Sequence, residues 1–538
     1  MPKLRFQSPD RLRGAADYSQ CPELRGSLNA VKLVKSQRWA WDGLRRACDL
    51  EVAYARKRDP GHWELAAVAF VTSRQVDVEP WYDETTEDLW RECGFSKKPS
   101  RQTVHRRLRE LEGVCDEFLN AAGLVIRHCR KHDARVMAHV HFDFTEDETH
   151  AALVHDCQPG EPCKRRGKAS ASGRVRNHAL RPRRATTQEA RERRERWNEE
   201  DPADSVNSAK AVTPKTMEVW RGGRRIKRVN LRGCWYRTRD VEAGVRAYTR
   251  KGRVKRFWHG YFSGKAVDHY TGGVIPSVDP ANKQEYDLFV PLYDRVVGMV
   301  GEVPQTVIGD RGFSVAKCFE HATTNGSAPV FPWRRYGDGK RHDKDTHDRH
   351  GVMRCKHCGG PMSQTKYSAK NGKPRLWFRC SLGVTPQCAK DQTITCATDW
   401  RALVPLARTE PLYHELRKSH QSYEGAHDYW RDRYRVAADT LANRPKGVGL
   451  GWHRLRANVA CLVDWLRIAA VNGWLGSARR VASKDVRPFR WSARDAAREL
   501  ADKRKKAGLG DPYGRQAKAL GIGEESPPSE RSGAPPGP

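Results

Sequence analysis

The sequence predicts a multidomain α/β protein, for three reasons. The chain has 538 residues, which is more than one ordinary domain contains. Helical patterning between residues 61 and 130 is followed by an alternating strand, hairpin strands, a helix and another strand, an order typical of a mixed sheet. Five of the 15 cysteines fall between Cys355 and Cys396, which indicates a small unit held together by a metal.

The composition is strongly basic. Lys and Arg number 99 against 65 Asp and Glu, which gives a formal net charge of +34 spread along most of the chain. Such a charge predicts attraction to polyanions, with nucleic acid as the first candidate. The opening residues, MPKLRFQSPD, contain no apolar signal segment, and no apolar run approaches the length of a membrane span. We therefore expect a cytoplasmic protein with no membrane partner.

The first part of the chain has the pattern of a DNA-binding unit. Residues 1–45 are basic and weakly patterned, whereas residues 46–130 have the periodicity of short helices. Ser100 can cap the helix SRQTVHRRLRELE, whose basic face resembles the third helix of a helix-turn-helix. The side chains expected to contact DNA are Arg101, Gln102, Arg106 and Arg107. The alternative is a small helical bundle whose arginines only face solvent.

Two aspartates stand where strands can present them. In VMAHVHFDFTEDETH, residues 136–150, the apolar residues alternate, so that Asp143 shares the other face with His139, His141 and Thr145. In TVIGDRGF, Asp310 follows an apolar strand at its carboxyl end, the edge where α/β sheets bind ligands. The acids that follow the first strand, Glu146, Asp147 and Glu148, are interpreted as turn residues, with Asp147 as the alternative ligand.

A third acid is expected from the segment LYHELRKSHQSYEGAHDYWRDRYRV, whose pattern predicts a helix. The candidates are Glu415, Glu424, Asp428 and Asp432. A few carboxylates are enough to hold Mg²⁺ or Mn²⁺, and two such ions can activate a water or 3′-OH nucleophile and stabilise a leaving oxygen. Each acid alone proves little, because an aspartate after a strand is often only a turn residue.

The cysteine cluster predicts a structural zinc site. Cys355-x2-Cys358 and Cys380-x7-Cys388 supply four thiolates, which leave no open position on a tetrahedral ion. The intervening KYSAKNGKPRLWFRC reads as a hairpin, so residues 350–398 are expected to form a zinc ribbon. Cys396 is a possible substitute for Cys388.

Two segments are expected to be solvated. Residues 157–231 form a basic insertion with few aliphatic residues, partly helical around QEARERRERW. Cys157 and Cys163, with His155 and His178, offer an irregular metal site there, against the alternative of ordinary thiols. Residues 476–538 form a basic C-terminal region whose tail, rich in Ser, Pro and Gly, is expected to be disordered.

Taken in order, these motifs resemble the DDE transposases of bacterial insertion sequences, which have a ribonuclease-H-like catalytic fold. The resemblance rests on VHFDFTEDETHAAL, WHGYFSGKAVDHYTGGVI, VIGDRGFS and the terminal helix LRANVACLVDWLRIAAVNGWL. It implies a catalytic domain formed by residues 136–156, 232–345 and 400–475, with the zinc ribbon inserted before the glutamate. It also implies that Asp143, Asp310 and a helical glutamate are catalytic and hold Mg²⁺ or Mn²⁺.

The glutamate is assigned from a helix signature of one family branch: Tyr, two residues, Arg, three residues, Glu, six residues, Lys. Aligning Glu424 with the signature Glu puts Arg431 on the Lys position, and puts His420 and Arg417 on the Arg and Tyr positions as departures. Glu415 fits worse. Arg417, Glu424 and Arg431 are spaced by seven and would share a helix face, where the arginines can hold DNA phosphates.

The resemblance implies a transposase that binds terminal inverted repeats, hydrolyses phosphodiesters and joins the freed 3′-OH ends to target DNA. Its partner would be double-stranded DNA, held by at least a homodimer in the bacterial nucleoid. A serine recombinase is a second class, but no catalytic domain with a nucleophilic serine precedes the helix-turn-helix. A third is a catalytically inactive, transposase-derived DNA-binding regulator.

Overall fold

A computed structural model describes about two thirds of the chain. The described residues are 24–51, 61–149, 151, 153–158, 161, 174–175, 210–212, 214–221, 223–231, 234–250, 253–333, 347–348, 350–368, 374–389, 391–395, 400–423, 425–436 and 449–475. Glu424, Cys396, Cys163 and His178 lie outside them, as do residues 1–23 and 476–538. No helix in the described part of the chain is both long enough and apolar enough to cross a membrane.

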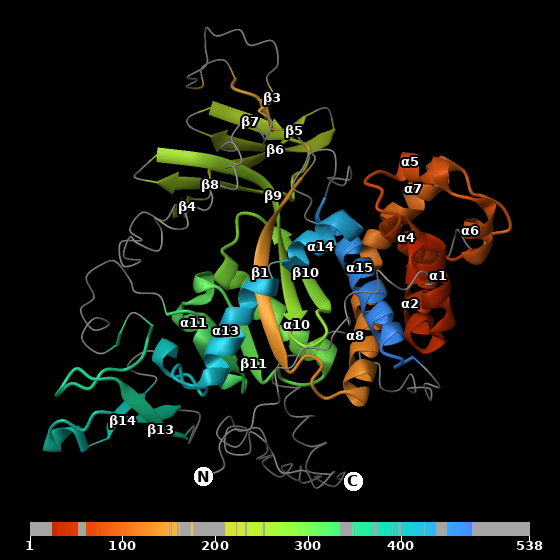
Figure 1. The fold of residues 1–538 in the computed structure, drawn as a ribbon. Helices are drawn as coiled ribbons and strands as arrows, with labels where there is room; N and C mark the ends of the chain where they lie inside the picture. Colours follow the sequence, from red (N-terminus) through yellow and green to blue (C-terminus); the bar gives the residue numbers. More distant parts are fainter. Residues whose placement is uncertain are drawn as a thin grey trace, which may run out of the picture.

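A mixed seven-stranded sheet forms the centre of the protein, in agreement with the predicted α/β class (Figure 1). β1 is paired in parallel with β11, and β11 in parallel with β12, whereas β9 runs antiparallel to β1, β8 and β10. The strands are β1 (His139–Glu148), β4 (Lys210–Val212), β8 (Gly244–Arg250), β9 (Arg253–Asp268), β10 (Val274–Pro280), β11 (Thr306–Gly309) and β12 (Ala328–Val330).

The hairpin predicted around DHYTGG is present between β9 and β10. Asp268 closes its turn: the carboxylate accepts hydrogen bonds from the backbone and hydroxyl of Thr271 and, across the sheet, from the backbone N–H of Met137 at 2.7 Å. Burial raises the pKa of Asp268 to about 6, against the effect of these donors. The side chain thereby ties the hairpin to the start of β1.

Helices cover both faces of the sheet. On one face, Phe289 of α10 (Glu285–Val300) packs on Phe142 of β1, with ring centroids 5.0 Å apart. On the other, Tyr423 of α13 (Pro411–Tyr423) stacks on His141 at 3.9 Å. The alternation read from the β1 sequence therefore separates an apolar face under α10 from a polar face under α13. α11 (Ala316–Thr324) connects β11 to β12, and α14 (Gly425–Tyr434) follows α13.

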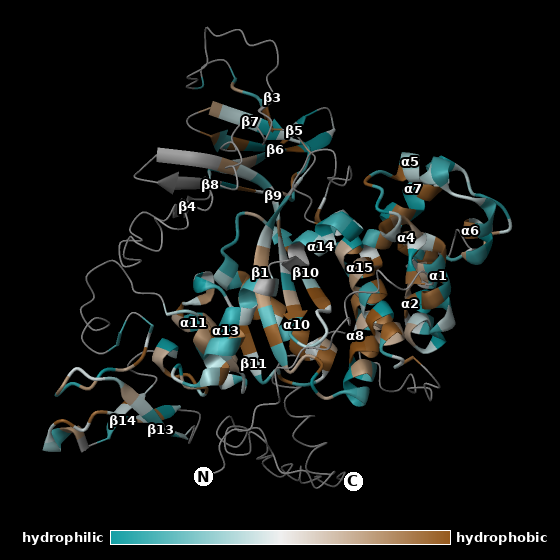
Figure 2. Cartoon of the chain, viewed as in Figure 1, coloured by the Kyte–Doolittle hydropathy of each residue, from teal (hydrophilic) through white to brown (hydrophobic). Residues whose placement is uncertain are grey.

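The N-terminal helices pack against the C-terminal helix α15 (Leu450–Val471). Figure 2 shows apolar faces of α8 and α15 turned toward each other, and one hydrophobic cluster runs from these helices into the central sheet. Ser100 accepts a hydrogen bond from the N–H of Thr103, which is the predicted cap. The helices are α1 (Gly26–Ser36), α2 (Arg38–Glu51), α4 (Trp63–Thr72), α5 (Val78–Glu84), α6 (Glu87–Glu92), α7 (Arg101–Glu110) and α8 (Cys115–His132).

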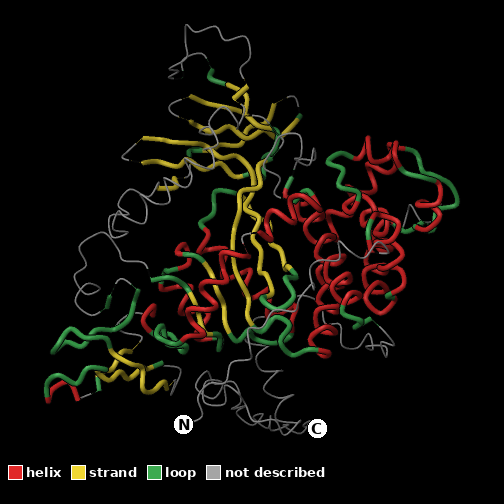
Figure 3. The backbone as a smooth tube through the Cα atoms, viewed as in Figure 1, coloured by secondary structure: helices red, strands yellow, loops and turns green. Residues whose placement is uncertain are grey.

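A second, antiparallel sheet continues from the far end of β1 and β9, as Figure 3 shows. Its strands are β3 (Arg174–Val175), β2 (Leu153–His155), β7 (Cys234–Thr238), β6 (Arg224–Leu231) and β5 (Thr216–Arg221). Part of the expected solvated insertion is thus folded, because Val229 and Leu231, two residues apart on one face of β6, are buried. The segment QEARERRERW, which was expected to be partly helical, lies outside the described residues.

Gly264 on β9 is predicted to be sensitive to any side chain. A Cβ there would lie 2.3 Å from the Phe144 ring and 2.4 Å from Ser277 Oγ, on strands held by the sheet on both sides. Gly264→Ala should therefore lower the free energy of unfolding by about 1–3 kcal/mol in urea denaturation. Gly43→Ala, on α2 with no atom within 4 Å of the new Cβ, is the matched control and should leave stability equal or slightly higher.

Candidate functional site

Asp143 lies on β1, and Asp310 directly follows β11, the strand that pairs with β1 in parallel. β1 and β11 pair His141 with Ile308 and Phe142 with Gly309, so the next residues in register are the two aspartates. β11 ends at Gly309, while β1 continues along β9, so both carboxylates lie at the carboxyl end of β11. Asp143 is half-buried and Asp310 is exposed. The structure therefore brings together the two acids predicted from strand ends.

The GDRG sequence gives Asp310 its position. Its Oδ1 accepts a hydrogen bond from the N–H of Gly312 at 2.7 Å and caps a short 3-10 helix, Arg311–Phe313. A Cβ on Gly312 would lie 2.8 Å from Asp310 Oδ1 and 2.9 Å from Oε2 of Glu285. Glycine is needed here because the space above it holds two carboxylates.

Glu285, the first residue of α10, is a site residue that sequence reasoning missed. Burial, and then the negative charge of Asp310, raise its pKa to about 7, with smaller contributions from Asp143 and Glu146 and an opposing one from Arg246. An acid in the first turn of a helix is ordinarily explained by the helix dipole, so nothing in the sequence marks this one. Four acids therefore influence one another at this edge of the sheet.

The oxygen-only donor set suits a hard divalent cation such as Mg²⁺, which keeps several waters and needs few carboxylates. A cation would also relieve the repulsion from Asp310 that, after burial, raises the pKa of Glu285. Among the described residues, however, the carboxylates of Asp143, Asp310 and Glu285 do not form a group of three within 4.8 Å of one another. The described acids can thus supply two neighbouring ligands and a third at longer range.

A buried lysine lies on the strand beside Asp143. Lys265 is the cross-strand partner of Asp143 on β9 and has no exposed surface. Burial, and then the charge of Arg431, lower its pKa to about 7, while Asp143 acts in the opposite direction. This lysine places a titratable donor on the polar face of the sheet next to the aspartates.

The end of α13 lies against the same polar face. His141 Nδ1 is 3.2 Å from Nδ1 of His420, and its Nε2 is 2.9 Å from Nδ1 of His269. Burial lowers the pKa of His420, with Asp143 opposing the shift. Tyr423 stacks on His141 and donates a hydrogen bond to the backbone oxygen of His269. Glu424 follows directly in the chain but is outside the described residues.

The competing acids have other surroundings. Asp147 is 2% exposed and pairs with Nδ1 of His453 at 2.9 Å. Burial lowers the pKa of His453, but Asp147 outweighs this and the net pKa is raised. Asp428 forms an ion pair with Arg431 at 2.7 Å, and Glu415 and Asp432 are exposed. Asp147 is thus committed to holding α15 on β1, whereas Arg417 is half-buried on α13.

The residues predicted to contact DNA lie mostly on the surface of α7. Arg101, Gln102 and Arg106 are exposed, although Arg106 approaches Glu110 at 4.0 Å. Arg107 differs, because its side chain is 13% exposed and pairs with Glu110. Three of the four side chains are therefore accessible to a ligand.

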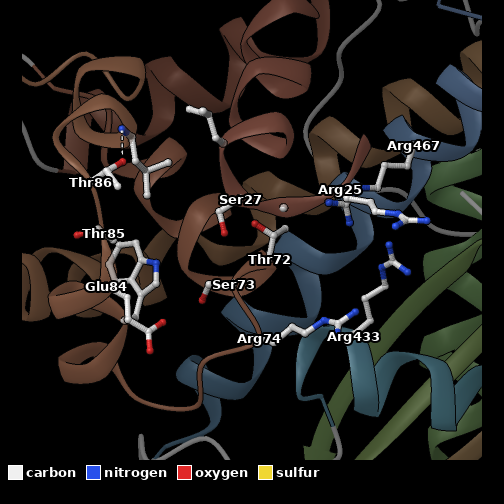
Figure 4. Close-up of a pocket in the computed structure, with 14 residues that line it drawn as sticks. Arg25, Ser27, Thr72, Ser73, Arg74, Glu84, Thr85, Thr86, Arg433 and Arg467 are labelled. Atoms are coloured by element: carbon white, nitrogen blue, oxygen red, sulfur yellow. Dashed lines mark hydrogen bonds between the residues drawn. The ribbon is translucent and has the colours of Figure 1, made fainter. Parts of the chain in front are cut away.

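A basic cavity of about 700 Å³ lies between the N-terminal helices and α14–α15. Figure 4 shows Arg25, Arg74, Arg433 and Arg467 gathered toward one side of it, with Glu84 on the opposite side. Arg467 donates a hydrogen bond to Tyr434 at 3.2 Å. The four arginines come from segments far apart in the chain, and their combined charge favours an anion in the cavity.

The four predicted cysteines form a cluster that can hold a metal such as zinc. Their sulfur atoms all lie within 4.8 Å of one another, with Cys355 3.8 Å from Cys388 and Cys358 3.5 Å from Cys380. Tetrahedral zinc thiolates are separated by about 3.8 Å, as follows from the usual Zn–S length. The sulfurs are carried by a three-stranded sheet with its own small core: β13 (Met362–Ser368), β14 (Arg375–Cys380) and β15 (Gln392–Thr395).

The raised pKa of Glu285 predicts a pH effect on stability without divalent ions. Because the folded pKa, about 7, exceeds the ordinary 4.5, the folded state keeps a proton that the unfolded state loses between these values. Stability should therefore fall as pH rises through this window, by at most about 3 kcal/mol. Glu285→Gln should reduce the fall, measured by urea denaturation from pH 5 to 8, and leave the part below about pH 6 that Asp268 contributes. Glu320→Gln, at an exposed position on α11, should leave it unchanged.

No protein-family model matches this chain, and no curated protein matches it either.

Proposed function

We propose that this chain is a DNA transposase of the DDE type, with a ribonuclease-H-like catalytic sheet. The observation that supports the proposal is the parallel pairing of β1 with β11, because extending its register by one residue would put Asp143 next to Asp310. The strand sequence β10-β9-β1-β11-β12, with β9 antiparallel to β1 and helices on both faces, supports the fold assignment.

In the proposed reaction, Asp143, Asp310 and Glu424 hold Mg²⁺ or Mn²⁺. The bound ions would activate a water or a 3′-OH and stabilise the leaving oxygen of a phosphodiester. Asp143 is fixed by its pairing with Lys265 on β9, and Asp310 by its bond to Gly312. Glu285 adds negative charge at the same edge and strengthens the attraction for a divalent cation.

Several surfaces fit DNA as the substrate. α4, α6 and α7 are proposed as the helix-turn-helix, with Arg101, Gln102 and Arg106 toward the duplex. The zinc ribbon is proposed to contact the transposon end, and the arginines of the cavity in Figure 4 to contact phosphates. Synapsis of two ends would require a homodimer, and the activity would take place on the bacterial nucleoid.

A second candidate, a catalytically inactive DNA-binding regulator, is favoured by one observation. The described carboxylates do not converge within 4.8 Å as a set of three. Under this alternative the basic surfaces would still bind DNA. The aspartates would have only a local structural role, such as the cap that Asp310 forms through its bond to Gly312.

The experiment that tests the proposal uses purified full-length protein and the DNA flanking its own gene. With Mg²⁺ or Mn²⁺, we expect strand breaks at repeat ends that leave 3′-OH groups, followed by joined products with a target plasmid. Specific end binding without breaks in either metal would reject the enzyme and support the regulator. Breaks accompanied by protein covalently attached to DNA would support a recombinase that uses a side-chain nucleophile.

A further inference from the structure

A second cluster of metal-ligating side chains lies in the antiparallel sheet, far from the four-cysteine site. His155, Cys157 and Cys234 each offer one ligand atom, and these atoms lie within 4.8 Å of one another. His155 ends β2 and Cys234 begins β7, so two strands contribute. The proposed transposase chemistry does not use this cluster.

Sheet register explains why the three side chains meet. β2 and β7 pair Val154 with Arg237 and His155 with Tyr236, and the next backbone bond, from Asp156 N–H to Trp235 O, continues this register at 2.8 Å. Cys157 is therefore opposite Cys234. Because alternate residues share a face, His155 and Cys157 lie on the same side of the sheet as Cys234.

A backbone donor already contacts the sulfur of Cys157. The N–H of Trp235 donates a hydrogen bond to Cys157 Sγ at 3.2 Å, the type of bond that stabilises negative charge on a ligand sulfur. Asp156, between the two ligands of β2, points the other way and pairs with Arg228 at 2.9 Å. The Asp156 carboxylate therefore does not lie on the face of the sheet that carries the three ligands.

An apolar core borders one side of the cluster, while His155 and Cys157 are half-buried. Cys234 is buried, and Cys157 packs on the core of the antiparallel sheet. That core consists of Leu153, Val229, Leu231, Cys234, Tyr236, Val245 and Phe257. Apolar surroundings strengthen the binding of an ion to thiolate and imidazole, because they keep water away from the bonds.

We propose that His155, Cys157 and Cys234 bind a second zinc ion, which clamps the ends of β2 and β7. Two thiolates and one imidazole are ligands that zinc prefers, and they would fill three positions of its tetrahedral set, with a water in the fourth. On binding, each thiol releases its proton to solvent, and the imidazole coordinates as the neutral base.

The test is the zinc content of the purified full-length protein after dialysis against a mild chelator. Wild type should hold two zinc ions per chain. Cys157→Ser and Cys358→Ser should each lower this to one, and the double variant should hold none. Cys318→Ser, which replaces a buried thiol in neither cluster, should still hold two. A wild type with one zinc, lost in Cys358→Ser and kept in Cys157→Ser, would overturn the proposal.

A second measurement keeps the proposal testable if one of the variants fails to fold. After Co²⁺ substitution, Cys358→Ser protein should retain thiolate-to-cobalt absorption, and adding His155→Ala should weaken or shift that absorption. Unchanged absorption would overturn the proposal. So would a Cys157–Cys234 disulfide, seen as two thiols that react with an alkylating reagent only after reduction, because their register also permits this bond.

Discussion

Asp143→Asn and Asp310→Asn should each lower Mg²⁺-dependent DNA cleavage on the order of a thousandfold. The amide keeps the size of each side chain, and at position 310 it can still accept the Gly312 hydrogen bond. What is lost is one negative charge and one strong oxygen ligand at the sheet edge. Cleavage rates on end-containing DNA measure the effect, with circular dichroism to check the fold.

Glu415→Gln is the matched control for these variants. Glu415 is a sequence candidate for the third ligand, but it is exposed on α13, so its neutralisation should leave the rate unchanged. Cleavage that persists in Asp310→Asn would show that this edge of the sheet takes no part in the reaction. If both aspartate variants are inactive but Glu424→Gln still cleaves, Glu285 becomes the next candidate, because it already senses the charge of Asp310.

Cys380→Ser should unfold the three-stranded metal unit while leaving the central sheet intact. The unit has a small core, and structural zinc contributes about 10–16 kcal/mol of apparent binding free energy in small zinc domains. We expect loss of one zinc per chain and rapid proteolysis within residues 350–395. Deletion of residues 350–398 should correspondingly weaken end binding while the core stays folded.

Cys129→Ser provides the control for this variant. Cys129 is buried in α8 and belongs to neither metal cluster, so the substitution should change neither the zinc content nor the protease pattern. If residues 350–395 resist the protease equally in Cys380→Ser and in wild type, the account is contradicted. That result would mean that the three-stranded unit folds without its metal.

Local spacing predicted the parts of the site that depend on neighbours in sequence. The four cysteines could be paired from two short motifs, and their sulfurs do lie together. Asp143 was identified on an alternating strand and Asp310 after an apolar one, and these two strands pair in parallel. In both cases the constraint is short-range, because one turn or one strand end sets the position of the side chain.

Other features depend on tertiary packing and left no local signal. Glu285 begins an ordinary amphipathic helix, and only the approach of Gly312 puts it beside Asp310. Residues 216–231 are rich in arginine and were expected to be solvated, yet β5 and β6 pair there, and the end of β6 is buried. The basic cavity joins arginines separated by hundreds of residues.

The most direct measurement is cleavage by Asp310→Cys in Mg²⁺ and in Mn²⁺. Thiolate binds Mg²⁺ poorly but accepts the softer Mn²⁺. If Asp310 holds the metal during phosphodiester cleavage, the variant should be inactive in Mg²⁺ and regain part of its activity in Mn²⁺, whereas wild type works in both. Cleavage in Mg²⁺ at the wild-type rate would show that Asp310 is no metal ligand and would contradict the proposed function of this edge.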